Sequence, residues 1–192
     1  MGAGKSTALQ ALERLGALTL STDAVVHDLY AHDEAVRDAV VARWGPEVAP
    51  AGTVDREAVA RHAFASADER AWLEQLIWPL VAQRVIEFRA AAEAADPAPP
   101  AAVVETPLLF EAGMAGVYDA TIAVIADEAV RAERAAARGH AAVDERAARQ
   151  LTQDEKATLA TYVVWNSGTV DELESALSTV LVKLTEAPPT TK

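Results

Sequence analysis

The sequence contains no cysteine among its 192 residues. The absence of cysteine excludes a disulfide-stapled scaffold, a zinc site built on thiolates and a cysteine nucleophile. The N-terminus also lacks the basic and then apolar layout of a signal peptide. Together these absences predict a cytoplasmic protein.

Long hydrophobic runs and an excess of positive charge are missing too. No run approaches the roughly 20 apolar residues that a membrane-spanning helix needs. The 17 Lys and Arg residues against 29 Asp and Glu residues give a net charge of −12, which repels nucleic acid and anionic lipid. We therefore expect a small molecule as partner and neither nucleic acid nor a membrane. The expected form is a monomer, although composition and charge do not determine it.

Short apolar runs alternate with segments of helical periodicity. Strands are expected at residues 17–20, 101–104, 121–126 and 162–165. Helices are expected at residues 5–15, 24–30, 34–44, 55–64, 67–78, 80–95, 128–138, 150–160 and 170–184. Strands that alternate with helices predict an α/β fold with a three-layer, doubly wound parallel sheet.

The domain organisation follows from one long helical stretch, at about residues 31–95, which exceeds a single crossover connection. We interpret it as a substrate-binding subdomain inserted into a single domain of residues 1–187. A short lid is expected at about residues 139–149, and a disordered tail at 188–192.

A phosphate-binding motif stands at the start of the sequence and runs into the first expected helix. It matches the second half of a P-loop, G-x-x-x-x-G-K-[ST], and comprises Gly2, Ala3, Gly4, Lys5, Ser6 and Thr7. In such a loop backbone N–H groups cradle phosphates, Lys5 bridges the β and γ phosphates, and the Ser6 hydroxyl binds Mg²⁺. The alternative is a chance Gly-Lys-Ser, but the helix that follows favours the motif.

Several blocks in order resemble the dephospho-CoA kinase family, P-loop kinases that complete coenzyme A synthesis. They are the P-loop, STDAVVH at 21–27, VDREA at 54–58, LIWPLV at 76–81, VVETPLLFE at 103–111, Arg134 with Arg138, QLTQDEK at 150–156, and Asn166-Ser167-Gly168. The resemblance covers almost the whole chain, and the block at 103–111 is the most specific.

The resemblance implies a P-loop kinase fold and an enzyme that uses ATP and Mg²⁺. Its reaction would transfer the ATP γ-phosphate to the ribose 3′-hydroxyl of dephospho-CoA, giving CoA and ADP, and residues 31–95 would bind the CoA moiety. Two alternatives stay open. One is another small-metabolite P-loop kinase, and the other is a catalytically inactive nucleotide- or CoA-binding homologue.

The sequence also departs from the family pattern, and these departures motivate the inactive alternative. Family Asp residues are replaced by Ser21, Glu105, Thr161 and Trp165, the family Arg by His27, and the family His by Trp78. We expect Trp78 to fill the core of the helical subdomain rather than to stack on a ligand.

Two carboxylates at strand ends are the candidate acidic groups. Asp23 is expected to accept the proton of the substrate 3′-hydroxyl; it could also cap the helix that follows, and the two roles can coexist. Glu105 is expected to orient Mg²⁺ through water, as a Walker-B-type carboxylate does; the alternative is that it caps the turn at Pro107.

Two arginines and one asparagine complete the candidate site. Arg134 and Arg138 are four residues apart, so they share a helix face and could close over the migrating phosphoryl group. The alternative is that Arg131, Arg134 and Arg138 form a solvated face paired with Glu128 and Glu133. Asn166 is expected to contact adenine, although an Asn-Ser-Gly turn needs no ligand.

The first glycine of a complete P-loop, and the strand that feeds it, would precede Met1. In the family this strand lies between the strands represented here by residues 101–104 and 121–126. Its loss would leave unpaired backbone groups at about 1–3 kcal/mol for each one that is buried. We therefore expect Met1 to be an internal methionine of the working protein.

Overall fold

The computed structural model describes residues 2–137 and 150–186. Arg138, the expected lid at 139–149 and the expected tail at 188–192 lie outside the described residues. The chain divides into two compact units, one made of residues 1–19 and 95–192 and the other of residues 20–94. Among the described helices, none combines the length and apolar character that crossing a bilayer requires.

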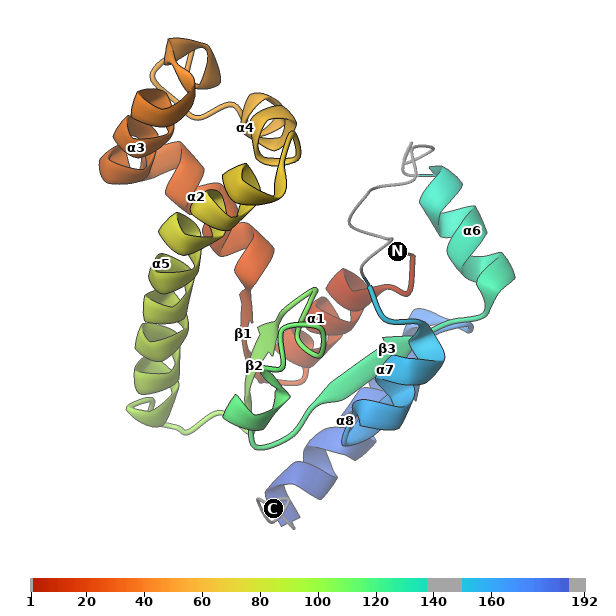
Figure 1. Ribbon diagram of the computed structural model, residues 1–192. Helices are drawn as coiled ribbons and strands as arrows, with labels where there is room; N and C mark the ends of the chain where they lie inside the picture. The colour runs from red at the N-terminus through yellow and green to blue at the C-terminus, as the bar shows by residue number, and fades with distance from the viewer. Residues whose placement is uncertain (1, 138–149, 187–192) are drawn as a thin grey trace. The chain divides into compact units, whose positions relative to one another are not determined.

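The first unit alternates helices and strands (Figure 1). Its elements are α1 (Lys5–Arg14), the start of β1 (Leu18–Ser21), β2 (Ala102–Glu105), η2 (Ala115–Val117), β3 (Ile122–Ile125), α6 (Glu128–Ala137), α7 (Gln153–Leu159), β4 (Tyr162–Trp165) and α8 (Val170–Glu186). The expected strands and helices of this unit are all present; β4 has the expected bounds, and the other elements have shifted ends. Helix α7 begins at Gln153 because Thr152 and Glu155 form a capping box there.

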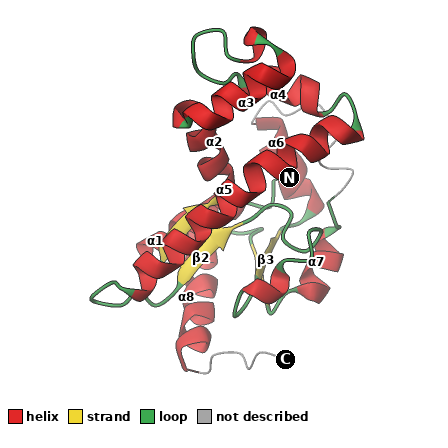
Figure 2. Cartoon of the chain, turned by 60° about the vertical axis from the view of Figure 1, so that its left-hand side comes forward, coloured by secondary structure: helices red, strands yellow, loops and turns green. Residues whose placement is uncertain are grey.

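The described strands form two pairs, which Figure 2 shows as separate groups of yellow arrows. Strand β1 pairs with β2, and β3 pairs with β4. The β3–β4 pair is parallel, with Ile122 opposite Tyr162 and Ile125 opposite Trp165. The α/β class with parallel strands is thereby confirmed, whereas a single three-layer, doubly wound sheet stays a prediction.

The core of the first unit lies between the strands and two helices. Leu12 of α1 and Leu177 of α8 are buried in one cluster with Val164 of β4, and Val103 and Val124 of the neighbouring strands pack against it. Residues that alternate along a strand share a face, so this cluster covers one face of both strand pairs. The packing holds the start of α1 beside the carboxyl ends of the strands.

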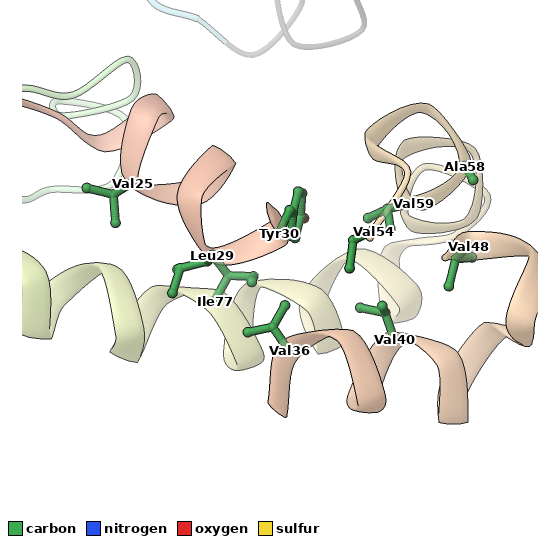
Figure 3. Packing of buried hydrophobic residues seen from close by; sticks show 10 residues of the cluster. All are labelled: Val25, Leu29, Tyr30, Val36, Val40, Val48, Val54, Ala58, Val59 and Ile77. Atoms are coloured by element: carbon green, nitrogen blue, oxygen red, sulfur yellow. The ribbon is translucent and has the colours of Figure 1, made fainter. Parts of the chain in front are cut away.

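The second unit is helical. It contains α2 (Thr22–His32), α3 (Glu34–Trp44), η1 (Pro46–Val48), α4 (Arg56–Ala63) and α5 (Ala67–Glu93). Figure 3 shows Leu29 of α2, Val36 of α3 and Ile77 of α5 pointing toward one another, and all three are at most 5% exposed. The unit therefore has a hydrophobic core of its own.

Helix α5 corrects two predictions. Residues 67–78 and 80–95 were expected to form separate helices, but one helix continues through Pro79. Proline costs one backbone hydrogen bond, to the carbonyl of Gln75. Leu76 and Leu80 pack against the same core on either side, which keeps the helix continuous. The prediction of a core Trp78 was wrong, because its side chain is 58% exposed.

A charged and aromatic cluster joins α3 to α5. Arg43 donates two hydrogen bonds to the Glu69 carboxylate, at 3.0 and 2.8 Å, and Trp44 Nε1 donates a third at 2.6 Å. These bonds lower the pKa of Glu69. Trp44 also stacks on His62 and meets Trp72 edge-on. The ionised Glu69 is therefore the centre of the contact between the two helices.

Candidate active site

The phosphate loop takes the conformation that its glycines permit. Gly2 has φ 80° and Gly4 has φ 85° and ψ 32°, both in the left-handed region that favours glycine. A Cβ on Gly4 would collide with Nδ2 of Asn166, and one on Gly2 would lie 2.5 Å from the carbonyl oxygen of Arg131. Both positions therefore require glycine for backbone conformation and for space.

Helix α1 begins directly after this loop. Its first backbone hydrogen bond runs from Ala8 N–H to Gly4 C=O at 2.9 Å, so the N–H groups of Lys5, Ser6 and Thr7 have no acceptor within the helix. The first turn carries no acidic side chain, and no side chain caps it. Aligned N–H groups and the positive end of the helix dipole suit this turn to binding phosphate.

The structure brings Lys5 and Glu105 together. Lys5 Nζ lies 4.0 Å from Glu105 Oε1, which places the last residue of β2 beside the first residue of α1. The Lys5 side chain is 44% exposed, whereas that of Glu105 is 14% exposed. The lysine can thus reach a bound phosphate while the carboxylate stays fixed at the strand end.

A second group of contacts gathers around Asn166, which is 4% exposed. Its side-chain Nδ2 donates to Ala3 C=O at 2.8 Å, and its own C=O accepts from Arg134 Nη1 at 2.7 Å. Arg131 instead pairs with Glu128 at 2.7 Å. Arg131 thus forms an ion pair of the kind that the alternative expected, but its side chain is only 24% exposed, whereas Arg134 is directed toward the phosphate loop.

Two cavities open around these residues. A cavity of about 300 Å³ is lined by Gly4, Thr7, Arg134, Asn166 and Gly168, among others. It therefore borders the phosphate loop, Asn166, and the Arg134 side chain that donates to the Asn166 carbonyl.

A larger cavity, of about 470 Å³, is lined by all of Ile122–Ile125, by residues that follow β2, and by Ala3 and Lys5 of the phosphate loop. Successive strand residues point to opposite faces, so a cavity that touches all four runs along the strand edge. Lys5 lines the larger cavity, and Gly4 and Thr7 line the smaller one, so both cavities border the candidate phosphate site.

Asp23 lies in the second unit, on the exposed first turn of α2. Helix α2 begins at Thr22 and its N-cap is Ser21, so the interpretation of Asp23 as the helix cap was wrong. Because the Asp23 carboxylate does not cap the helix, capping does not prevent it from acting on a ligand.

An ion pair that the sequence reasoning missed lies beside the larger cavity. Lys156 Nζ is 2.9 Å from Glu111 Oε1, which also accepts from Leu151 N–H. Burial raises the pKa of Glu111, but the hydrogen bonds from Lys156 and the backbone outweigh it, so the pKa lies below its ordinary value. Both residues belong to blocks that the sequence singled out, yet their 45-residue separation gave no signal of contact.

The available metal donors are oxygen atoms. In the described part of the chain, no three acidic or histidine side chains gather to hold a metal ion by themselves. Mg²⁺ in phosphate-transfer sites usually takes one or two protein oxygens and completes its shell with phosphates and water. The Ser6 hydroxyl, which follows Lys5 in the sequence, and the Glu105 carboxylate, which pairs with Lys5, are oxygen donors of that kind.

Comparisons with known proteins identify the family and the fold. A family profile described as dephospho-CoA kinase matches residues 1–172. A dephospho-CoA kinase of Geobacter metallireducens is 36% identical over 178 residues, which cover 91% of this chain and 88% of that protein. A solved crystal structure from Thermus thermophilus superposes with a TM-score of 0.77 at 33% identity, covering 96% of this chain and 94% of that one. The fold also resembles a dephospho-CoA kinase from Campylobacter jejuni, with a TM-score of 0.69 at 18% identity and coverage of 97% and 94%.

Proposed function

Because the chain belongs to the dephospho-CoA kinase family, we infer that it transfers the γ-phosphoryl group of ATP to the ribose 3′-hydroxyl of dephospho-CoA. This reaction gives CoA and ADP, and it makes the protein a transferase of coenzyme A biosynthesis. The observation that carries the assignment to this chain's own residues is the pairing of Lys5 with Glu105 beside a phosphate loop that opens α1.

We propose that the loop and the start of α1 hold the donor. Backbone N–H groups from Gly2 to Thr7 would surround the phosphates, and Lys5 would move from Glu105 to the β and γ phosphates. Ser6 and Glu105 would hold Mg²⁺, which when bound neutralises charge on the phosphate oxygens. The support is the absence of acidic side chains in the first turn and the contact of Lys5 with the Glu105 carboxylate.

The remaining roles concern the transfer itself. Arg134, with Arg138, would neutralise the charge that spreads over the migrating phosphoryl group. Asp23 would accept the proton as the bond from the 3′-oxygen to phosphorus forms and the bond from phosphorus to the leaving ADP oxygen breaks. Support for Arg134 comes from its position in the wall of the smaller cavity. Support for Asp23 comes from its place in the family block at residues 21–27.

The finer architecture is also part of the proposal. Residues 31–95 would form the CoA-binding insert, and the separate core of the helical unit supports this. The two strand pairs would belong to one doubly wound sheet in three layers. In support, α1 and α8 pack on one face, α7 contacts β3, and the edge of β3 away from β4 borders open space. A cytoplasmic monomer remains the proposed form.

A coupled ADP-release assay with a panel of acceptors tests this function. ATP and Mg²⁺ are supplied throughout, and dephospho-CoA is compared with nucleoside monophosphates and with no acceptor. Turnover that depends on dephospho-CoA supports the proposal. Turnover with a nucleoside monophosphate alone would favour another P-loop kinase, and ATP binding without any turnover would favour an inactive homologue.

A further inference from the structure

Asn166 is expected from the sequence to contact adenine, but its side-chain nitrogen is directed to the phosphate loop. Nδ2 donates to the carbonyl oxygen of Ala3 at 2.8 Å, and Asn166 is 4% exposed. The fit is close, because a Cβ on Gly4 would collide with the same nitrogen. The asparagine and the loop are thus in direct contact without any ligand between them.

This contact fixes the orientation of one peptide group. The carbonyl of Ala3 and the N–H of Gly4 belong to the same planar peptide, and in the trans form they point in opposite directions. When Asn166 holds the carbonyl, the Gly4 N–H must face the other side of the loop. Rotation of this peptide changes ψ of Ala3 and φ of Gly4, and the glycine at position 4, with φ 85°, restricts that rotation less than another residue would.

Asn166 is itself held in place by the strand ladder. Its backbone N–H donates to Ile125 C=O at 2.7 Å, at the end of the β3–β4 pair. Its backbone C=O accepts from Arg134 Nη1 at 2.7 Å. One residue at a rigid strand end therefore fixes both the loop peptide and the guanidinium group that faces it.

We propose that Asn166 is a positioning residue for phosphate binding. It presents the Gly4 N–H to the phosphate chain by holding Ala3 C=O, and it aligns Arg134 through its own carbonyl. It does so without reading the adenine base. This inference refines the proposed function, since it assumes that the loop binds the phosphates of ATP. A preformed loop does not have to be ordered when the ligand binds, which raises affinity for the phosphate chain.

Two probes separate a role in positioning from a contact with the base. ATP and inorganic triphosphate are titrated by calorimetry into the wild-type protein and into Asn166→Ala. Loss of a buried hydrogen bond predicts that both ligands weaken by about tenfold in the variant. Weaker ATP binding with unchanged triphosphate binding would instead assign Asn166 to the base. Unchanged binding of both ligands would also overturn the proposal.

A matched control variant distinguishes a loss of positioning from a general loss of stability. Thr161 Oγ1 accepts from Thr121 N–H at 3.1 Å, at the opposite end of the same strand pair. Thr161→Ala removes a comparable bond and is expected to leave the affinity for both probes unchanged. In steady state, Asn166→Ala should raise the KM for ATP by a similar factor and leave the KM for dephospho-CoA unchanged. Equal changes in both KM values would indicate a general structural role and contradict the proposal.

A measurement on the wild-type protein tests the proposal without requiring that any variant folds. With ¹⁵N-labelled glycine, the Gly4 amide resonance should shift when inorganic triphosphate saturates the protein, whereas that of exposed Gly52 should not. An unchanged Gly4 resonance at saturation would overturn the proposal. Triphosphate binding requires no acceptor, so the inference can fail while turnover of dephospho-CoA succeeds, and the reverse also holds.

Discussion

The ammonium group of Lys5 lies 4.0 Å from the carboxylate of Glu105, so the first residue of α1 and the last residue of β2 form an ion pair beside the phosphate loop. The pair places a mobile cation next to a fixed anion. Without nucleotide, the carboxylate keeps the lysine close to the loop. With nucleotide, the phosphates compete for the lysine, and the carboxylate becomes available to support the metal.

The first prediction concerns Lys5. Lys5→Ala is expected to lower kcat at least about 100-fold, because one cation that stabilises the transferring phosphoryl group is lost. The fold should persist, since the side chain is 44% exposed. Lys183→Ala removes the same charge from exposed α8 and should leave kcat unchanged. Near wild-type kcat in a folded Lys5→Ala protein would refute the phosphate-loop assignment.

Asp23 should affect the chemical step more than donor binding. Asp23→Asn is expected to lower kcat by about 10²–10⁴-fold, the range of general base catalysis, with little change in the KM for ATP. Steady-state kinetics with each substrate varied in turn measures both constants. Asp28→Asn is the control, because Asp28 is an exposed carboxylate on the same helix that pairs with His32 and Arg84. A raised KM for ATP with kcat preserved would move Asp23 to a role in metal binding or structure.

Glu105 should determine the metal requirement. Glu105→Gln keeps the size of the side chain and removes the charge, so the Mg²⁺ concentration for half-maximal rate should rise severalfold. Glu105→Asp keeps the charge and restores the residue of the family pattern, so it should stay close to wild type. The measurement is the initial rate against free Mg²⁺ for the three proteins. Superimposable curves for Gln and Glu would contradict a role in metal binding.

The helical unit should lose stability when Glu69 loses its charge. Hydrogen bonds from Arg43 and Trp44 lower the pKa of Glu69, so its ionised form stabilises the folded state. This stabilisation is complete above the unfolded pKa, about 4.3, and is lost as the pH falls through the lower, folded pKa. Glu69→Gln should therefore unfold at lower urea concentration than wild type at neutral pH, and the difference should shrink in acid.

The control for this prediction is on the same helix. Glu93 pairs with Arg89 at 2.8 Å, but both side chains are more than 60% exposed. Surface pairs contribute little to stability, so Glu93→Gln should change the urea midpoint far less. A difference between wild type and Glu69→Gln that grew in acid would contradict the assigned direction of the pKa shift.

Local sequence signals predicted much of the fold. The period of the apolar residues identified α3 and β4 with the bounds that the structure has, because caps and turn residues flank both segments. The prediction that the helix ends at Pro79 was wrong, because packing on both sides of the proline outweighs one missing hydrogen bond. The strands divide into pairs between β2 and β3, which is the place where the family resemblance puts a further strand.

The sequence likewise predicted one part of the candidate site and not another. Lys5 and Glu105 were identified separately, from a phosphate motif and from a strand end, and the structure places them together. The link between Asn166 and Ala3 spans 163 residues, and no spacing rule predicts it. Asn166 stood out only as part of a motif, and its partner could be identified only once β4 and the loop had been placed in space.

The identity of the product tests the central claim most directly. The protein is incubated with ATP, Mg²⁺ and dephospho-CoA, and the acceptor is recovered for mass spectrometry and phosphorus NMR. The account predicts that the acceptor gains one phosphoryl group on the ribose 3′-oxygen, in equal amount to the ADP formed, and that Lys5→Ala yields almost none. Dephospho-CoA recovered unchanged by a folded protein that binds ATP, or phosphorylated at another position, would contradict it.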